Sequence, residues 1–197
     1  MIPDVPAGIR LLGITGAPGV GKSTLAASLG LPVVPMDGFH YADVELVRRG
    51  LRDRKGAPET FDAEGYAALL GRVRAGEADV VAPMFERGLE QPLAGAIAVP
   101  PTGTVVTEGN YLLLDEPRWR AVRAEIDVVW HLTLDEEVRV GRLVARHIEF
   151  GKTPDEARAW VERVDGANAR LVEAARDRAD LVIDVGARPR TPRASGR

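Results

Sequence analysis

Short apolar runs recur along the chain, and segments in which apolar residues follow helical spacing lie between them. The runs predict strands and the intervening segments predict helices. Their alternation is typical of a parallel sheet with helices on both faces, so we predict an α/β fold. The expected strands lie at residues 9–15, 31–36, 104–107, 127–132 and 181–185, and the expected helices at 24–29, 45–49, 62–75, 117–125, 135–150, 153–168 and from there to 178.

Two weaker apolar segments, residues 80–85 and 94–99, are joined by a polar stretch. We interpret them as a hairpin at the edge of the main sheet. Residues 50–61 are rich in charge and glycine, which predicts a long loop. We see no internal repeat, so residues 1–187 are expected to form a single domain. The basic, proline-rich residues 188–197 are expected to be a disordered tail.

Composition narrows the classes of function. The chain has 197 residues and a net charge of -3 at pH 7, so nothing indicates a surface for nucleic acid or an anionic membrane. It contains no cysteine, which excludes disulfides and thiolate metal sites and fits a reducing compartment. The N-terminus lacks the pattern of a signal peptide, and no apolar run has the length of a membrane span. We therefore expect a cytoplasmic protein without nucleic-acid or membrane partners.

The segment from Gly16 to Ser23, GAPGVGKS, matches the phosphate-loop pattern G-x-x-x-x-G-K-[ST]. It lies between a predicted strand and a predicted helix, which is the context that the pattern requires. Its glycines allow backbone conformations that turn N–H groups toward phosphate oxygens, aided by the positive end of the helix dipole. We expect Lys22 to contact the β and γ phosphates and the Ser23 hydroxyl to hold Mg²⁺. The expected nucleotide-binding residues are Gly16, Ala17, Gly19, Val20, Gly21, Lys22, Ser23 and Thr24.

Ligands of open α/β sheets bind beyond the carboxyl ends of the strands, and an acidic residue follows two of the predicted strands. Asp37 follows the second strand and is a candidate general base for an acceptor hydroxyl. Glu108 follows the third, where phosphate-loop enzymes keep the acid that orients Mg²⁺. The two acids could exchange roles, and the residues alone leave this open. Candidate acceptor contacts are His40, Tyr41, Asn110 and Tyr111, and also Arg87 in the hairpin turn, for which a place on the rim is the alternative.

Three arginines on one predicted helix, Arg139, Arg142 and Arg146, follow each other at spacings of three and four and so share a face. Such a cluster suits a lid that closes over ATP and stabilises charge on the transferred phosphoryl group. The alternative is a solvated face on which Arg139 pairs with Asp135 or Glu136. We favour a functional role for Arg142 and Arg146, which lie toward the end of the helix.

In combination, these motifs resemble those of the phosphoribulokinase, uridine kinase and bacterial pantothenate kinase family. The nearest match is its nucleoside/nucleotide kinase-like branch, also called fructose transport system kinase-like. The resemblance spans residues 9–185 and rests on GAPGVGKST, PMDGFHY (35–41), RKGAPETFD (54–62), EGNYLLL (108–114), RLVARH (142–147) and ADLVI (179–183).

This resemblance implies a P-loop fold with a five-stranded parallel sheet, an added hairpin and an arginine-bearing lid. It implies ATP and Mg²⁺ as cofactors and transfer of the γ-phosphate to a hydroxyl of a sugar, nucleoside or pantothenate-like acceptor. Asp37 resembles the catalytic base of the family, Lys22 and Ser23 its phosphate and Mg²⁺ ligands, and Arg142 and Arg146 its lid arginines. Relatives are often dimers, so a homodimer is possible.

The chain departs from the branch at Glu86, where an aspartate often precedes the hairpin arginine. The acceptor-binding segments of uridine and pantothenate kinases are not clearly reproduced either. The alternative function is an ATP-binding regulatory or switch module with slow hydrolysis. A GTPase would need an Asn-Lys-x-Asp segment and a transport ATPase a Leu-Ser-Gly-Gly signature, and the sequence contains neither.

Overall fold

A computed structural model describes residues 2–186 of the chain. Its centre is a five-stranded sheet in the order β2-β5-β1-β6-β7, and all four pairings are parallel. This confirms the predicted α/β fold. The strands are β1 (Leu11–Gly16), β2 (Val33–Pro35), β5 (Val105–Glu108), β6 (Val128–Thr133) and β7 (Leu181–Asp184).

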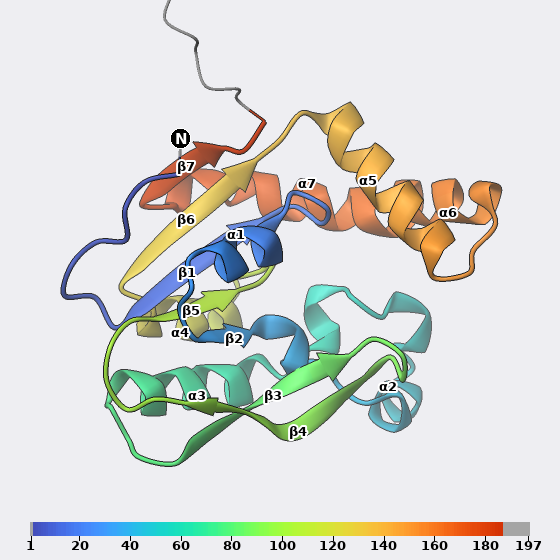
Figure 1. Ribbon diagram of the computed structural model, residues 1–197. Helices are drawn as coiled ribbons and strands as arrows, with labels where there is room; N and C mark the ends of the chain where they lie inside the picture. Colours follow the sequence, from blue (N-terminus) through green and yellow to red (C-terminus); the bar gives the residue numbers. More distant parts are fainter. Residues whose placement is uncertain (1, 187–197) are drawn as a thin grey trace, which may run out of the picture.

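Helices cover both faces of this sheet (Figure 1). Side chains from α3, α4 and α7 pack in the larger of two apolar clusters, while α1 packs in the smaller cluster on the opposite face. The alternation of Leu11 with Leu12 along β1 divides them between the two clusters, as a central strand requires. The helices are α1 (Lys22–Ser28), α2 (Asp43–Arg49), α3 (Ala63–Arg74), α4 (Pro117–Glu125), α5 (Glu136–Glu149), α6 (Pro154–Trp160) and α7 (Gly166–Ala174).

The predicted hairpin is present, and it lies beside β2, an edge strand of the main sheet. Strands β3 (Val80–Glu86) and β4 (Gln91–Val99) form a two-stranded antiparallel sheet of their own beside β2 (Figure 1). The three-residue β2 ends in Pro35, and Pro83 lies within β3. Because proline has no N–H to donate to a ladder, these residues remove donors at the boundary between the two sheets.

The segment after α5 also differs from expectation. Instead of a break near residue 168, α6 runs through a π-helical turn, Val161–Asp165, directly into α7. The predicted capping box is present, because Thr153 and Glu156 bond each other's backbone N–H groups. π-helical turns are frequent at functional sites, and this one ends at an acid that contacts α5. Together α5, α6 and this turn form the helical projection at one end of the molecule (Figure 1).

Two further expectations concern membrane-spanning helices and the C-terminal tail. No helix within residues 2–186 combines the length and the apolar character that crossing a membrane requires. The predicted disordered tail, residues 188–197, lies outside the described residues. The division into one domain and a tail stays a prediction.

Candidate active site

The phosphate loop joins β1 to α1 and closes around its own lysine. Gly16, Gly19 and Gly21 all have positive φ angles, of 148°, 82° and 108°. Lys22 is only 8% exposed, and its Nζ donates to the carbonyl oxygens of Gly16 at 2.9 Å and Ala17 at 3.2 Å. Burial lowers the pKa of Lys22, while the negative charges of Glu108 and Asp37 oppose that shift. The predicted loop residues therefore come together as one turn beside two acids.

Glu108 ends β5 next to this loop, and its carboxylate accepts a hydrogen bond from the Ser23 hydroxyl at 2.9 Å. Burial, and after it the negative charge of Asp37, raises the pKa of Glu108 above its ordinary value, while Lys22 opposes the shift. The hydroxyl and the carboxylate are hard oxygen ligands of the kind that Mg²⁺ takes. Within residues 2–186, no three or more His, Asp or Glu side chains gather into a metal-binding group. Ser23 and Glu108 are therefore the residues of this site that would hold Mg²⁺.

Asp37 lies on the 3₁₀ turn Met36–Phe39 directly after β2. The turn packs tightly under β3, because a Cβ on Gly38 would lie 2.4 Å from the Pro83 carbonyl oxygen. On its other side, a Cβ on Gly109 would lie 2.4 Å from Met36 Cβ. The turn that contains Asp37 is therefore packed closely between β3 and the strand-end motif that contains Glu108.

His40 follows this turn and stands between two aromatic rings. Its ring centroid lies 3.9 Å from that of Phe61 and 4.9 Å from that of Phe85, and its Nδ1 contacts the Asp37 carbonyl at 2.9 Å. Burial lowers the pKa of His40, so the neutral ring is favoured. Neither phenylalanine was identified from the sequence, because their approach to His40 depends on how the hairpin and the loop at residues 50–61 pack. Tyr41 has the Arg49 guanidinium 4.1 Å from its ring centroid.

Asn110 and Tyr111 differ in the exposure of their side chains and in their hydrogen bonds. Asn110 is half-buried, and its backbone carbonyl accepts from the Thr15 hydroxyl at 3.0 Å. Tyr111 is fully buried, and its hydroxyl donates to the Gly56 carbonyl at 2.6 Å. Asn168 of α7 donates to the same carbonyl at 3.3 Å. Tyr111 thus binds the loop at residues 50–61 through its hydroxyl, and its side chain has no exposed surface for an acceptor in this structure.

The arginines of α5 differ in burial and in contacts. Arg139 is 3% exposed; it makes two hydrogen bonds with Glu136, at 2.9 and 2.7 Å, and donates to the Pro18 carbonyl of the phosphate loop at 2.8 Å. This bears out the pairing with Glu136 considered from the sequence. Arg142 Nη1 lies 3.9 Å from where a Cβ on Gly21 would be, which places it over the loop.

Arg146 lies one turn further along α5 than Arg142. The surrounding protein, and after it the positive charge of Arg87, lowers the pKa of Arg146, whereas Asp37, Asp165 and Glu108 raise it. Asp165, at the end of the π-helical turn, accepts from His147 Nε2 at 3.0 Å and so ties α7 to α5. Asp165 was missed from the sequence because nothing in its local pattern indicates this contact.

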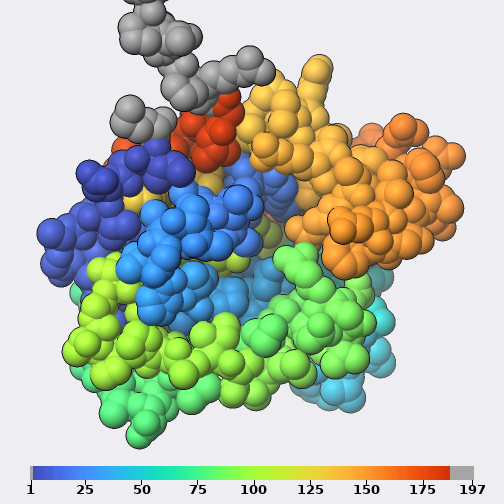
Figure 2. Space-filling view, viewed as in Figure 1, coloured from blue at the N-terminus to red at the C-terminus, as the bar shows by residue number. Residues whose placement is uncertain are grey.

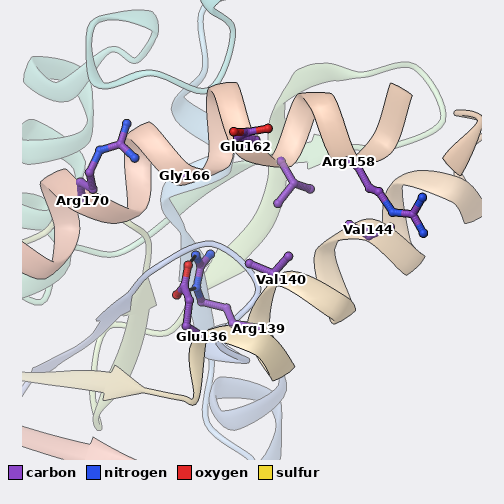
Figure 3. Close-up of a pocket in the computed structure, with 9 residues that line it drawn as sticks. Glu136, Arg139, Val140, Val144, Arg158, Glu162, Gly166 and Arg170 are labelled. Carbon is purple, nitrogen blue, oxygen red and sulfur yellow. Dashed lines mark hydrogen bonds and ion pairs between the residues drawn. The ribbon is translucent and has the colours of Figure 1, made fainter. Parts of the chain in front are cut away.

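A separate cavity of about 300 Å³ lies between α5 and the α6–α7 segment (Figure 3). Arg139, Val140 and Val144 line it from α5, and Glu162 and Arg170 from the opposite side (Figure 3). The acids Asp37 and Glu108 are not among its lining residues. It therefore lies between these helices, apart from the site that the strand ends form.

Several proteins that this chain resembles are named as kinases. Over 192 residues the chain is 33% identical to "Putative uridine kinase C227.14" of Schizosaccharomyces pombe, covering 88% of this chain and 82% of the relative. It is 34% identical to "Uncharacterized protein YggC" of Escherichia coli, covering 85% and 74%. A comparison with profiles of protein families found no match.

Among solved structures, the "putative fructose transport system kinase" from Silicibacter sp. TM1040 superposes with a TM-score of 0.81 at 44% identity, over 92% of this chain and 93% of that one. The fold, the site and the extent of these similarities confirm the resemblance drawn from the motifs. The chain belongs to the uridine kinase-like family of P-loop kinases, which are small-molecule phosphotransferases with alcohol acceptors.

Proposed function

We propose that this kinase transfers the γ-phosphate of ATP to a hydroxyl group of a small sugar, nucleoside or pantothenate-like acceptor. The observation that carries the proposal is the Ser23–Glu108 hydrogen bond beside a phosphate loop whose lysine lies within the influence of both Glu108 and Asp37. A phosphate loop alone indicates nucleotide binding only. Two acids at neighbouring strand ends, facing that loop, add what phosphoryl transfer to an alcohol needs.

Each residue then has a separate task. The backbone of the phosphate loop and Lys22 bind the β and γ phosphates, and Arg142 and Arg146 stabilise charge on the transferred group. Ser23 and Glu108 would hold Mg²⁺, which neutralises charge on the phosphate oxygens when bound. Asp37 orients the acceptor hydroxyl and accepts its proton.

The contact with Ser23 is the reason for assigning the base role to Asp37 instead of Glu108. Glu108 is committed to the hydroxyl that P-loop kinases use for the metal, at 2.9 Å. Asp37 is half-buried on a turn that begins the acceptor side of the site, next to His40 and below β3. A carboxylate there can reach a hydroxyl that enters from the hairpin side.

The test is ADP release from Mg-ATP with a panel of sugars, nucleosides and pantothenate, with the Lys22→Ala variant as blank. Strong stimulation by one acceptor, absent in the variant, is the expected result. Tight ATP binding with no stimulation by any acceptor, together with stimulation by a protein partner, would support the regulatory module instead.

A further inference from the structure

The start of α7 carries two polar side chains that contact different parts of the molecule. Asp165 ends the π-helical turn, and Asn168 comes three positions later, a spacing that places both on one side of the helix. Asp165 accepts from His147 Nε2 of α5 at 3.0 Å, whereas Asn168 donates to the Gly56 carbonyl at 3.3 Å. One turn of the chain therefore bonds both the predicted lid helix and the loop at residues 50–61.

This loop is in turn bonded to the 3₁₀ turn of the candidate base. The Tyr41 N–H donates to the Thr60 carbonyl at 2.9 Å, and the Asp62 N–H donates to the Phe39 carbonyl at 2.8 Å. These are backbone hydrogen bonds on both sides of the same short segment, so the two stretches of chain are held side by side. A displacement of the loop would therefore be passed on to the turn of the candidate base.

At its other end, the series of contacts reaches the phosphate loop. Arg139 donates to the Pro18 carbonyl at 2.8 Å, and a Cβ on Gly19 would lie 2.7 Å from Leu143 Cγ. His147 lies one helical turn beyond Leu143 on α5. Figure 2 shows α5 and α6 (orange), the hairpin (green) and α2 (cyan) gathered at one end of the molecule. A nucleotide at the phosphate loop thus acts on a helix that is bonded, further along, to α7.

We propose that Asp165 and Asn168 are positioning residues that couple the lid helix to the loop at residues 50–61, and through it to the turn of the candidate base. The inference rests on the proposed kinase function, because phosphoryl transfer needs the nucleotide and the base in place together. Nucleotide at the phosphate loop then restrains the acceptor side even without an acceptor. By linkage, an acceptor strengthens nucleotide binding by the same factor.

Hydrogen–deuterium exchange measured by mass spectrometry tests this coupling without an identified acceptor. The probe is Mg²⁺ with a non-hydrolysable ATP analogue, and the readout is the change in exchange that it causes in peptides covering residues 16–29 and 50–61. In the unmodified chain we expect exchange to slow about 5-fold or more in both peptides. Slower exchange in 16–29 alone would leave nucleotide binding in place and overturn the coupling. No change in either peptide would contradict nucleotide binding by the phosphate loop, and the coupling with it.

Asp165→Ala is the decisive variant, because its printed partner lies on α5 and not in the loop whose exchange is measured. We expect it to abolish the nucleotide-dependent slowing in residues 50–61 and to keep that in residues 16–29. Asp165→Asn keeps an oxygen that can accept from His147, so we expect it to retain the slowing in both peptides. A response of residues 50–61 that persists in Asp165→Ala would overturn the proposal.

Two further variants separate coupling from support of the fold. Asn168→Ala is expected to lose the response of residues 50–61 in the same way, whereas a residue that only stabilises the loop would change its exchange equally with and without nucleotide. Arg170→Gln, at an exposed position on the same helix, is the matched control and is expected to keep the response. Loss of the response in Arg170→Gln as well would assign the effect to a general loosening of α7 and overturn the proposal.

Discussion

Two carboxylates near one phosphate loop have different surroundings, and this difference separates their tasks. Glu108 is 8% exposed, bonded to Ser23 and close to Lys22, which suits an acid that stays in place throughout a reaction cycle. Asp37 is more accessible and lies on a turn whose backbone is fixed by Gly38. A base needs such access, because its partner enters and leaves in each cycle.

The Asp37→Asn variant removes the proton acceptor and keeps the shape of the turn. We expect kcat to fall about 10²-fold to 10⁴-fold, while the affinity for a non-hydrolysable ATP analogue stays the same. Steady-state kinetics and calorimetry measure the two quantities, and Asp53→Asn in the neighbouring loop is the control. If Asp37→Asn keeps most of its turnover, the base is another residue, and Glu108→Gln is the next variant to measure.

Some site residues could be predicted from the sequence because their positions follow from a local motif. The phosphate loop, Asp37 and Glu108 each lie at the end of a strand or directly after it, so the order of elements alone places them at one edge of the sheet. The contact of Arg139 with Pro18 joins residues 121 positions apart, and no periodicity signals it. The same holds for Phe85 over His40.

At the scale of elements, the first half of α5 is attached to the phosphate loop. Arg139 bonds the Pro18 carbonyl, and a Cβ on Gly19 would lie 2.7 Å from Leu143 Cγ. Gly19 also has a φ of 82°, which residues with a Cβ rarely adopt. The first half of α5 is therefore fixed to the phosphate loop by a buried hydrogen bond and a close approach, whereas Arg146 lies beyond these contacts.

Two matched substitutions on α5 distinguish a residue that we expect to stabilise the fold from one that we expect to bind ATP. Arg139→Gln removes buried hydrogen bonds to the loop and to Glu136, so we expect it to lower the free energy of unfolding by about 1–3 kcal/mol. Arg142→Gln, an exposed position one turn later, is expected to leave that free energy nearly unchanged and to raise the KM for ATP. Urea unfolding and steady-state kinetics on both variants test this division, and the reverse pattern would contradict it.

Prediction of the elements succeeded where hydrophobic spacing was sufficient and was incomplete where pairing between strands or the geometry of a helical turn decides. The five strands of the sheet, their parallel arrangement and the presence of the hairpin follow from apolar runs and the segments between them. The separation of the hairpin from the main sheet does not, because the shift after Ala82 and the prolines at the boundary act through pairing between strands. The π-helical turn before α7 likewise has no pattern that distinguishes it from a regular helix.

At the scale of the whole molecule, the site lowers the stability of the fold. Burial and the charge of Asp37 raise the pKa of Glu108 above its ordinary 4.5. Below about pH 4.5, such an acid is protonated in both the folded and the unfolded state, and its raised pKa then costs no free energy of folding. The cost grows as pH rises from there toward the folded-state pKa, and above that value it stays constant.

The Glu108→Gln variant keeps an oxygen that can accept from the Ser23 hydroxyl and removes the charge. We expect it to increase the free energy of unfolding at about pH 7.5, and to increase it less at about pH 4. Urea unfolding at both values measures this, with the exposed Glu137→Gln as control. A larger gain at the lower pH would mean that the charged form of Glu108 is favoured in the folded protein.

The distribution of lysine gives this molecule a built-in set of chemical reporters. Only three lysines occur in 197 residues, and each lies in a different segment of the molecule. Lys22 is buried in the phosphate loop, Lys55 ties the acceptor-side loop to the hairpin, and Lys152 lies with its Nζ 4.8 Å from the ring centroid of Trp160 beyond the lid helix. Acylation with an amine-specific reagent followed by peptide mass spectrometry would therefore report separately on the phosphate loop, on the loop at residues 50–61 and on the segment after α5. The measurement needs one sample and no engineered label.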